Sequence, residues 1–144
     1  MVAPGREASL RLLLDTMNER PGMADPENAL LPFGFFERLH FARFALLDDA
    51  TTADLEAFGL PRPKVPPLYL AFVGECDGPV QAQFEEFVEK AGSGLRRIFA
   101  HCEGFDGSSH ARLLAWLAAH DLPVGANYVT RIGRTVRHVL GGSE

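Results

Sequence analysis

The chain has 144 residues, of which 47% are apolar, and its formal net charge is -5. This length fits one domain with one core, and the apolar content excludes wholesale disorder. Acidic and basic residues are mixed without a basic run, which argues against nucleic acid as a partner.

The first predicted element is a helix over about residues 8–19, where leucines recur at helical spacing before Arg20-Pro21-Gly22. Residues 21–34 are rich in Pro, Gly and Asn, and we interpret them as a loop. We therefore expect an N-terminal helix-and-loop extension over residues 1–34 and a core domain over residues 35–144.

A strand is predicted over residues 39–47, stopped by Asp48-Asp49. Both alternating sets of side chains are largely apolar, apart from Arg43, so we expect the strand to be buried on both sides. A short helix capped by Thr52 and ending at Gly59 follows, and then a second strand over residues 68–73.

The next helix is expected to begin after Asp77-Gly78-Pro79 and to end at Gly92-Ser93-Gly94. A third strand is predicted over residues 95–102, a helix capped by Ser108 or Ser109, and a fourth strand over residues 126–132. This order predicts an α+β fold, with a ferredoxin-like antiparallel sheet that carries helices on one face. A second copy of the chain or the N-terminal extension would cover the open face.

Four segments carry a resemblance: His40-Phe41-Ala42-Arg43, Asp77-Gly78, His101-Cys102-Glu103-Gly104-Phe105 and Gly133-Arg134-Thr135-Val136. They resemble an uncharacterised bacterial family, and similar segments occur beside haem peroxidase-like proteins. The expected fold is similar to the dimeric α+β barrels, which include haem enzymes, cofactor-free monooxygenases and small-molecule binders. A fold at this level does not by itself transfer a function.

Arg43 and His101 are the candidate catalytic residues. A guanidinium within an apolar strand needs an ion-pair partner or an anionic ligand, and a histidine titrates near neutral pH. On neighbouring central strands, Arg43 with Phe41 and His101 with Phe99 would share one face and line an apolar pocket. The alternatives are a structural salt bridge for Arg43 and a strand-end histidine bonded to backbone.

Asn127 and Tyr128 in the fourth strand point to opposite faces, so one of them should reach the pocket. We therefore count both, with Phe41 and Phe99, as candidate substrate-binding residues.

No metal site is expected. The five histidines show no HExxH motif and no ligand spacing, and the two cysteines form neither a CxxC pair nor part of a zinc set. Haem needs no spacing motif and stays open as a cofactor, with His110 as the axial candidate. No nucleotide loop and no GxSxG elbow is present.

The N-terminus shows no signal peptide, and nowhere do about 18 apolar residues follow one another. We therefore expect a cytoplasmic protein without a membrane partner.

Three functions follow as hypotheses. The first is a homodimeric small-molecule-binding domain, with or without acid/base chemistry. The second is a haem-dependent enzyme or haem-binding protein of the barrel type. The third is a non-catalytic accessory or interaction subunit.

Overall fold

The computed structural model describes residues 1–48 and 51–122. Within these ranges the chain is a mixed α+β fold, with two small antiparallel sheets and four α-helices. In chain order the elements are α1 (Glu7–Asp15), β1 (Asn18–Arg20), β2 (Met23–Ala24), a 3-10 turn (Phe33–Phe35), β3 (Leu39–Asp48), α2 (Thr51–Ala57), β4 (Leu68–Cys76), α3 (Val80–Phe99) and α4 (His110–Ala119).

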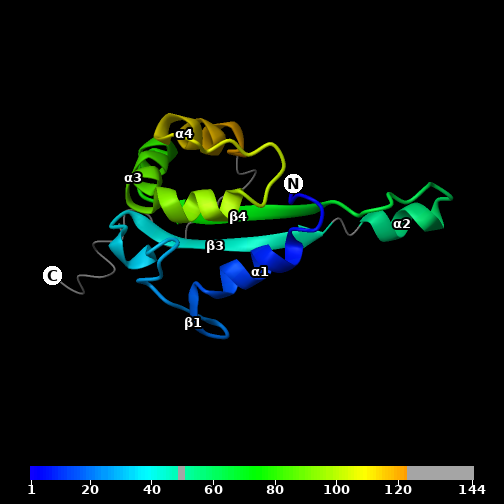
Figure 1. The fold of residues 1–144 in the computed structure, drawn as a ribbon, viewed down its shortest axis with the longest axis horizontal. Coiled ribbons are helices and arrows are strands. Elements are labelled where there is room, and N and C mark those ends of the chain that lie inside the picture. Colours follow the sequence, from blue (N-terminus) through cyan, green and yellow to red (C-terminus); the bar gives the residue numbers. More distant parts are fainter. Residues whose placement is uncertain (49–50, 123–144) are drawn as a thin grey trace.

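The centre of the fold is a long antiparallel ribbon formed by β3 and β4 (Figure 1). Cross-strand partners lie on the same face of such a ribbon, so its pairing defines two faces. The inner face carries the pairs Ala42–Gly74, Phe44–Phe72 and Leu46–Leu70, and the outer face carries Phe41–Glu75, Arg43–Val73, Ala45–Ala71 and Leu47–Tyr69. Only inner-face residues pack against the hydrophobic core.

Helices α1 and α3 contribute the other side of this core, and α4 packs on α3. Aromatic contacts join the layers: Phe72 meets Phe87 of α3 with ring centroids 5.3 Å apart, and Phe44 meets Phe99 at 6.3 Å. Leu10 of α1 is fully buried, as are Leu95, Ile98 and Leu113 of the two later helices. The N-terminal helix and the loop after it therefore contribute to the same core as the ribbon.

The predicted strands over residues 39–47 and 68–73 are confirmed, and β4 runs three residues further to Cys76. The predicted N-terminal helix is present, but it ends at Asp15 and not near residue 19. Thr16 is its C-cap, and β1 begins at Asn18. Ser109 caps α4 as expected, since its hydroxyl accepts a hydrogen bond from the Arg112 amide at 3.2 Å.

The predicted third strand over residues 95–102 is wrong, because Leu95–Phe99 are the last turn and a half of α3. Gly92-Ser93-Gly94 suggested a helix stop, but the helix runs straight through them. A Cβ at position 94 would lie 1.8 Å from the carbonyl oxygen of Leu30, so this glycine permits close packing of α3 against the preceding loop. Leu95 and Ile98 simply continue the buried stripe of the helix.

The expectation that β3 is buried on both sides is also wrong for the single chain. On the outer face Phe41 is 47% exposed, Leu47 51% and Tyr69 45%. Helices α1 and α3 pack on the inner face, and no element of residues 1–48 and 51–122 covers the outer one. The sheet of β3 and β4 has two strands, so the expected ferredoxin-like arrangement is only loosely matched in the part of the chain described.

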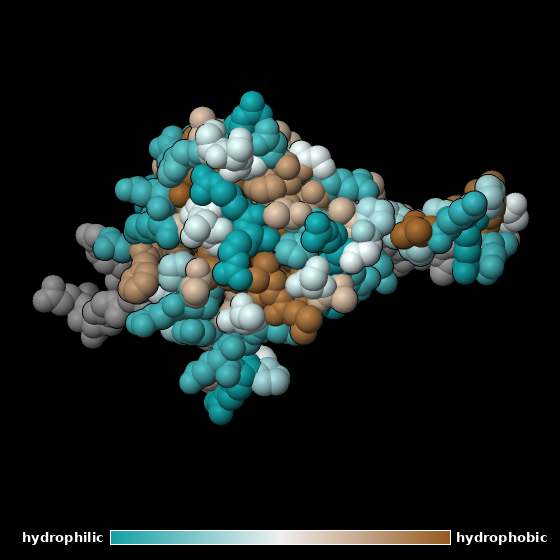
Figure 2. All heavy atoms as spheres, viewed as in Figure 1, coloured by the Kyte–Doolittle hydropathy of each residue, from teal (hydrophilic) through white to brown (hydrophobic). Residues whose placement is uncertain are grey.

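Between β3 and β4 the chain projects away from the body as an arm, residues 51–67, which carries α2 near its end (Figure 1). Phe58, Leu60 and Val65 on this arm are 79%, 54% and 67% exposed. Hydrophobic surface is visible on the arm in Figure 2. The predicted fourth strand over residues 126–132 lies outside the described residues.

Gln83 of α3 is the one polar side chain of the helix that is placed deep in the core, at 2% exposure, and neither amide atom finds a hydrogen-bond partner among the described residues. Because a buried orphaned amide costs about 1–3 kcal/mol, we expect Gln83→Met to raise the free energy of unfolding by about that amount. Urea denaturation measures this, and Gln81→Met at an exposed position of the same helix is the control. A loss of stability in Gln83→Met would show instead that the amide is bonded, for example to a buried water.

Candidate functional site

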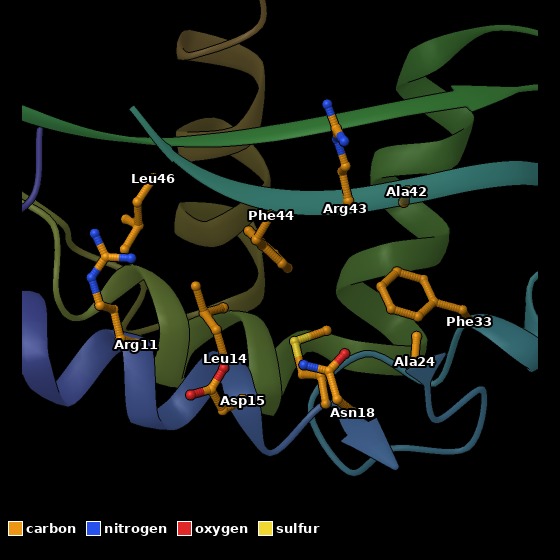
Figure 3. A pocket seen from close by; sticks show the side chains of 11 residues that line it. Arg11, Leu14, Asp15, Asn18, Ala24, Phe33, Ala42, Arg43, Phe44 and Leu46 are labelled. Carbon is orange, nitrogen blue, oxygen red and sulfur yellow. The ribbon is translucent and has the colours of Figure 1, made fainter. Parts of the chain in front are cut away.

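Arg43 and Phe41 lie on the outer face of the ribbon, where both are exposed. Within the described ranges the Arg43 guanidinium forms no ion pair, so the alternative of a structural salt bridge inside the chain, for example to Asp48 or Glu103, is not met there, while a partner subunit stays open as the source of a partner. Figure 3 shows the Arg43 side chain turned away from Ala42 and Phe44, its neighbours on the inner face.

His101 follows the C-terminus of α3 and does not lie on a strand. Its Nδ1 atom is 3.0 Å from the carbonyl oxygen of Arg97 and 3.2 Å from that of Ile98. Since a carbonyl only accepts hydrogen bonds, Nδ1 carries a proton and donates. This contact matches the alternative in which the histidine is bonded to backbone.

Phe99 is buried and contacts Phe44 on the inner face, which is the side opposite to Arg43 and Phe41. The structure therefore does not gather Arg43, His101, Phe41 and Phe99 around one pocket. Asn127 and Tyr128, the other candidate binding residues, lie outside the described residues.

A cleft of about 360 Å³ opens instead between α1 and the inner face of β3 (Figure 3). Its apolar side chains come from four places in the chain: Leu14 within α1 and Met17 after it, Ala24 of β2, Phe33 of the 3-10 turn, and Ala42, Phe44 and Leu46 of β3. Of its polar residues, Arg11, Asp15 and Asn18 stand along the N-terminal segment, and Arg43 lies on β3 with its side chain turned away from Phe44.

The charged residues of α1, Arg11 and Asp15, therefore form one wall of the cleft. The Arg11 guanidinium is paired with Glu7 of the preceding helical turn at 2.9 Å, which holds it over this wall. Asp15 lies one turn further along α1. An apolar floor with a few polar groups on one side is the usual composition of a small-molecule site.

Sequence reasoning missed this cleft, although it identified the helix that forms it. The helical spacing of Leu10, Leu14 and Met17 indicated an apolar stripe that had to pack against something. What the pattern could not indicate was that the stripe leaves a gap against β3.

A second polar cluster joins two of the segments that carry the resemblance. His40 Nε2 lies 2.9 Å from Asp77 Oδ1, so the start of β3 is bonded to the turn between β4 and α3. The Asp77 amide also donates to the carbonyl of Arg38 at 2.8 Å, and the Arg38 guanidinium lies 3.7 Å from Glu86 of α3. A carboxylate in this position fixes the orientation of an imidazole, and here it also ties the sheet to the helix.

The third segment of the resemblance, residues 101–105, makes structural contacts with the N-terminus and with α4. Cys102 forms a β-bridge with Val2, and the Glu103 amide donates to the carbonyl of Met1 at 2.9 Å. Gly104 has a φ of 69°, a conformation that suits glycine, and Phe105 then packs edge-on against Trp116 with ring centroids 5.1 Å apart. These residues hold the N-terminus and α4 against the end of α3. The fourth segment, from Gly133, lies outside the described residues.

Both cysteines are free thiols. Burial raises the pKa of the Cys102 thiol above its ordinary value, and burial likewise raises the pKa of Cys76 despite the nearby Arg38 cation. Because the thiolate is the nucleophile, a raised pKa makes both side chains poor nucleophiles at neutral pH.

Among the residues that the structure describes, no group of three or more His, Cys, Asp and Glu side chains is placed to hold a metal ion. None of the described residues lining the α1–β3 cleft is a histidine, and His110 is exposed at the start of α4. The residues present therefore do not fit a haem held by an axial histidine in this cleft. In the same ranges, no helix combines the length and apolarity that crossing a bilayer requires.

Comparison of the chain with models of protein families, with curated proteins and with solved structures finds no match. The mixed α+β architecture is loosely compatible with a ferredoxin-like arrangement. The resemblance of the four segments to a bacterial family stays a prediction.

Proposed function

We propose that the chain is a homodimeric small-molecule-binding domain whose ligand lies in the cleft between α1 and β3. The observation that carries the proposal is the cleft itself, with its volume of about 360 Å³, its apolar floor and its charged wall. This volume is within the range of about 300–1,000 Å³ that small-molecule sites occupy.

The side chains favour an amphipathic ligand. An apolar body would lie on Leu14, Phe33 and Phe44, where it loses contact with water. A polar head would meet Arg11, Asp15 or Asn18 along the opposite wall. The proposal is one of binding, and it assigns no reaction to the cleft.

The anionic, hydrophobic dye 1-anilinonaphthalene-8-sulfonate is a suitable probe. We expect it to bind saturably to the wild-type protein with a rise in fluorescence, and Ala42→Leu to weaken binding at least about tenfold, because the added side chain occupies the floor of the cleft. Arg11→Ala should weaken it less, through loss of one exposed cation beside the sulfonate.

Ala118→Leu is the matched control, since it adds the same side chain at an exposed position of α4. Circular dichroism verifies that both leucine variants are folded. Equal dye affinity in folded Ala42→Leu and in the wild type would overturn the assignment of the cleft.

A second candidate function is that of an interaction subunit. It is favoured by the apolar residues Phe58, Leu60 and Val65 on the projecting arm, which are not covered by any other described part of the chain. A protein that is monomeric by light scattering at all concentrations, and that shows no dye binding in the cleft, would contradict both candidates.

A further inference from the structure

The outer face of the ribbon presents an apolar surface with two charges. Its apolar members are Phe41, Ala45, Leu47, Tyr69, Ala71 and Val73. Its charges are Arg43 on β3 and Glu75 on β4, and in the part of the chain described neither enters an ion pair. Covering this face would bury apolar area, and it would also require a partner for each charge.

The geometry points to a second copy of the same chain as the occupant, in one particular register. This interface rests on the homodimer proposed above and specifies it. Two outer faces pack against each other about a twofold axis that runs parallel to the strands, so that β3 of each copy lies over β4 of the other.

The charges select this axis. A twofold axis parallel to the strands leaves each residue at the same position along the ribbon and places β3 of one copy over β4 of the other. Arg43 therefore comes over the partner's Val73, and the partner's Glu75 lies two residues along the same strand. Two residues of strand span about 7 Å, a distance that an arginine side chain covers. Symmetry then forms the Arg43–Glu75 pair twice.

A twofold perpendicular to the strands would reverse the ribbon instead. Arg43 would then lie over Leu47 of the second copy, and Glu75 would lie beyond the end of the opposing face. Neither charge would then gain a partner from the second copy, and each would be desolvated with only the opposite charge of its own chain within reach, which is an unfavourable arrangement.

The apolar residues fit the same register. Ala45 and Ala71 at the centre of the face are small and permit close approach of the two ribbons, and Leu47 comes over Tyr69 of the other copy. Both arms project from the same end of the dimer, because the axis runs along the strands. Phe58, Leu60 and Val65 can therefore be buried between the two arms, which enlarges an interface that the two-stranded face alone would leave small.

Charge reversal combined with mixing tests this register. Sedimentation equilibrium on the full chain should show a dimer for the wild type. Arg43→Glu alone places two glutamates against each other at each of two symmetric sites, and Glu75→Arg alone places two arginines there. We expect each single variant to raise the dimer dissociation constant at least about 100-fold.

Mixing the two single variants should restore a dimer with wild-type affinity. In the mixed dimer, the carboxylate introduced by Arg43→Glu faces the guanidinium introduced by Glu75→Arg at one site, and the native Glu75 and Arg43 face each other at the other. Rescue on mixing requires the two positions to meet across the interface. Contacts within one chain cannot produce it, because each single variant keeps its two like charges within its own chain after mixing. Arg97→Glu, an exposed charge reversal on α3, is the control and should leave the dimer unchanged.

The failures are distinguishable. A wild-type dimer that Arg43→Glu and Glu75→Arg do not weaken would overturn this interface and leave the homodimer standing. Single variants that are monomeric and are not rescued on mixing would overturn the register. A monomeric wild type would overturn the interface and the homodimer together, and would assign the outer face to another part of the chain or to a different partner.

Discussion

Replacing Gly94 with alanine is expected to destabilise the fold by about 3 kcal/mol or more, measured by urea denaturation. The Cβ would lie 1.8 Å from the carbonyl oxygen of Leu30 and 2.5 Å from its Cα. These are backbone atoms of a buried loop, and they cannot move aside as the end of a flexible side chain could. Relief requires α3 to separate from the loop, which opens the core around Leu31 and Leu95.

Gly92→Ala is the matched control, two residues earlier in the same helix. There a Cβ would meet the tip of the Arg96 guanidinium at 3.2 Å and a methyl group of Leu113 at 3.8 Å. Alanine favours a helix over glycine by about 1 kcal/mol, so this variant should be neutral or slightly stabilised. Equal losses in the two variants would contradict the close approach of Leu30 to Gly94.

Replacing Asn28 with alanine should cost about 4 kcal/mol of unfolding free energy, because it leaves several buried backbone groups without partners. The Asn28 amide nitrogen donates to the carbonyls of Asp25 at 2.9 Å and Leu31 at 2.7 Å. Its oxygen accepts from the amides of Leu30 at 3.0 Å and Leu31 at 2.9 Å. The side chain, which is 3% exposed, thus shapes the loop that presents Leu30 and Leu31 to the core.

Asn18→Ala removes the same side chain from an exposed position and should change the free energy of unfolding by less than about 0.5 kcal/mol. Asn28→Asp is a further variant, since it keeps the size of the side chain but loses both donated hydrogen bonds and should also be strongly destabilised. A loss below about 1 kcal/mol in Asn28→Ala would mean that the loop is not held by this side chain.

These two sites show where sequence reasoning stopped. Asn28 stands in a segment rich in Pro, Gly and Asn, which correctly predicted a loop but did not reveal a buried one. Gly94 stands in a Gly-Ser-Gly sequence, and glycine favours both a helix end and a close approach between backbones. Only the position of Leu30 decides between the two, and Leu30 is distant in the sequence.

Ending the predicted helix at Gly94 also led to the wrong candidate site. Once residues 95–102 are interpreted as a strand, Phe99 and His101 alternate with Ile98 and fall beside Arg43. As a helix, the same residues turn Phe99 toward Phe44 and leave His101 at the helix end, bonded to the carbonyls of Arg97 and Ile98. A short apolar segment fits both periodicities, so its pattern alone could not separate them.

The open outer face was a further difference. Apolar residues in both alternating sets of β3 led us to expect that both of its faces are buried, with Arg43 as the charge on one of them. The expectation is wrong for the part of the chain that the structure describes, which covers the inner face and leaves Phe41, Leu47 and Tyr69 of the outer face exposed. The dimer proposed for the outer face would reconcile the two.

By itself, the sequence determined the α+β class, the strands of the central ribbon, the N-terminal helix and the serine cap of α4. All of these depend on local periodicity and on the preferences of residues close together in the chain. Tertiary structure alone decided the length of α3, the cleft between α1 and β3, the His40–Asp77 contact and the exposure of Arg43. Each of these depends on which distant segments meet, because packing between them can override a local glycine signal and can bring together side chains that no spacing relates.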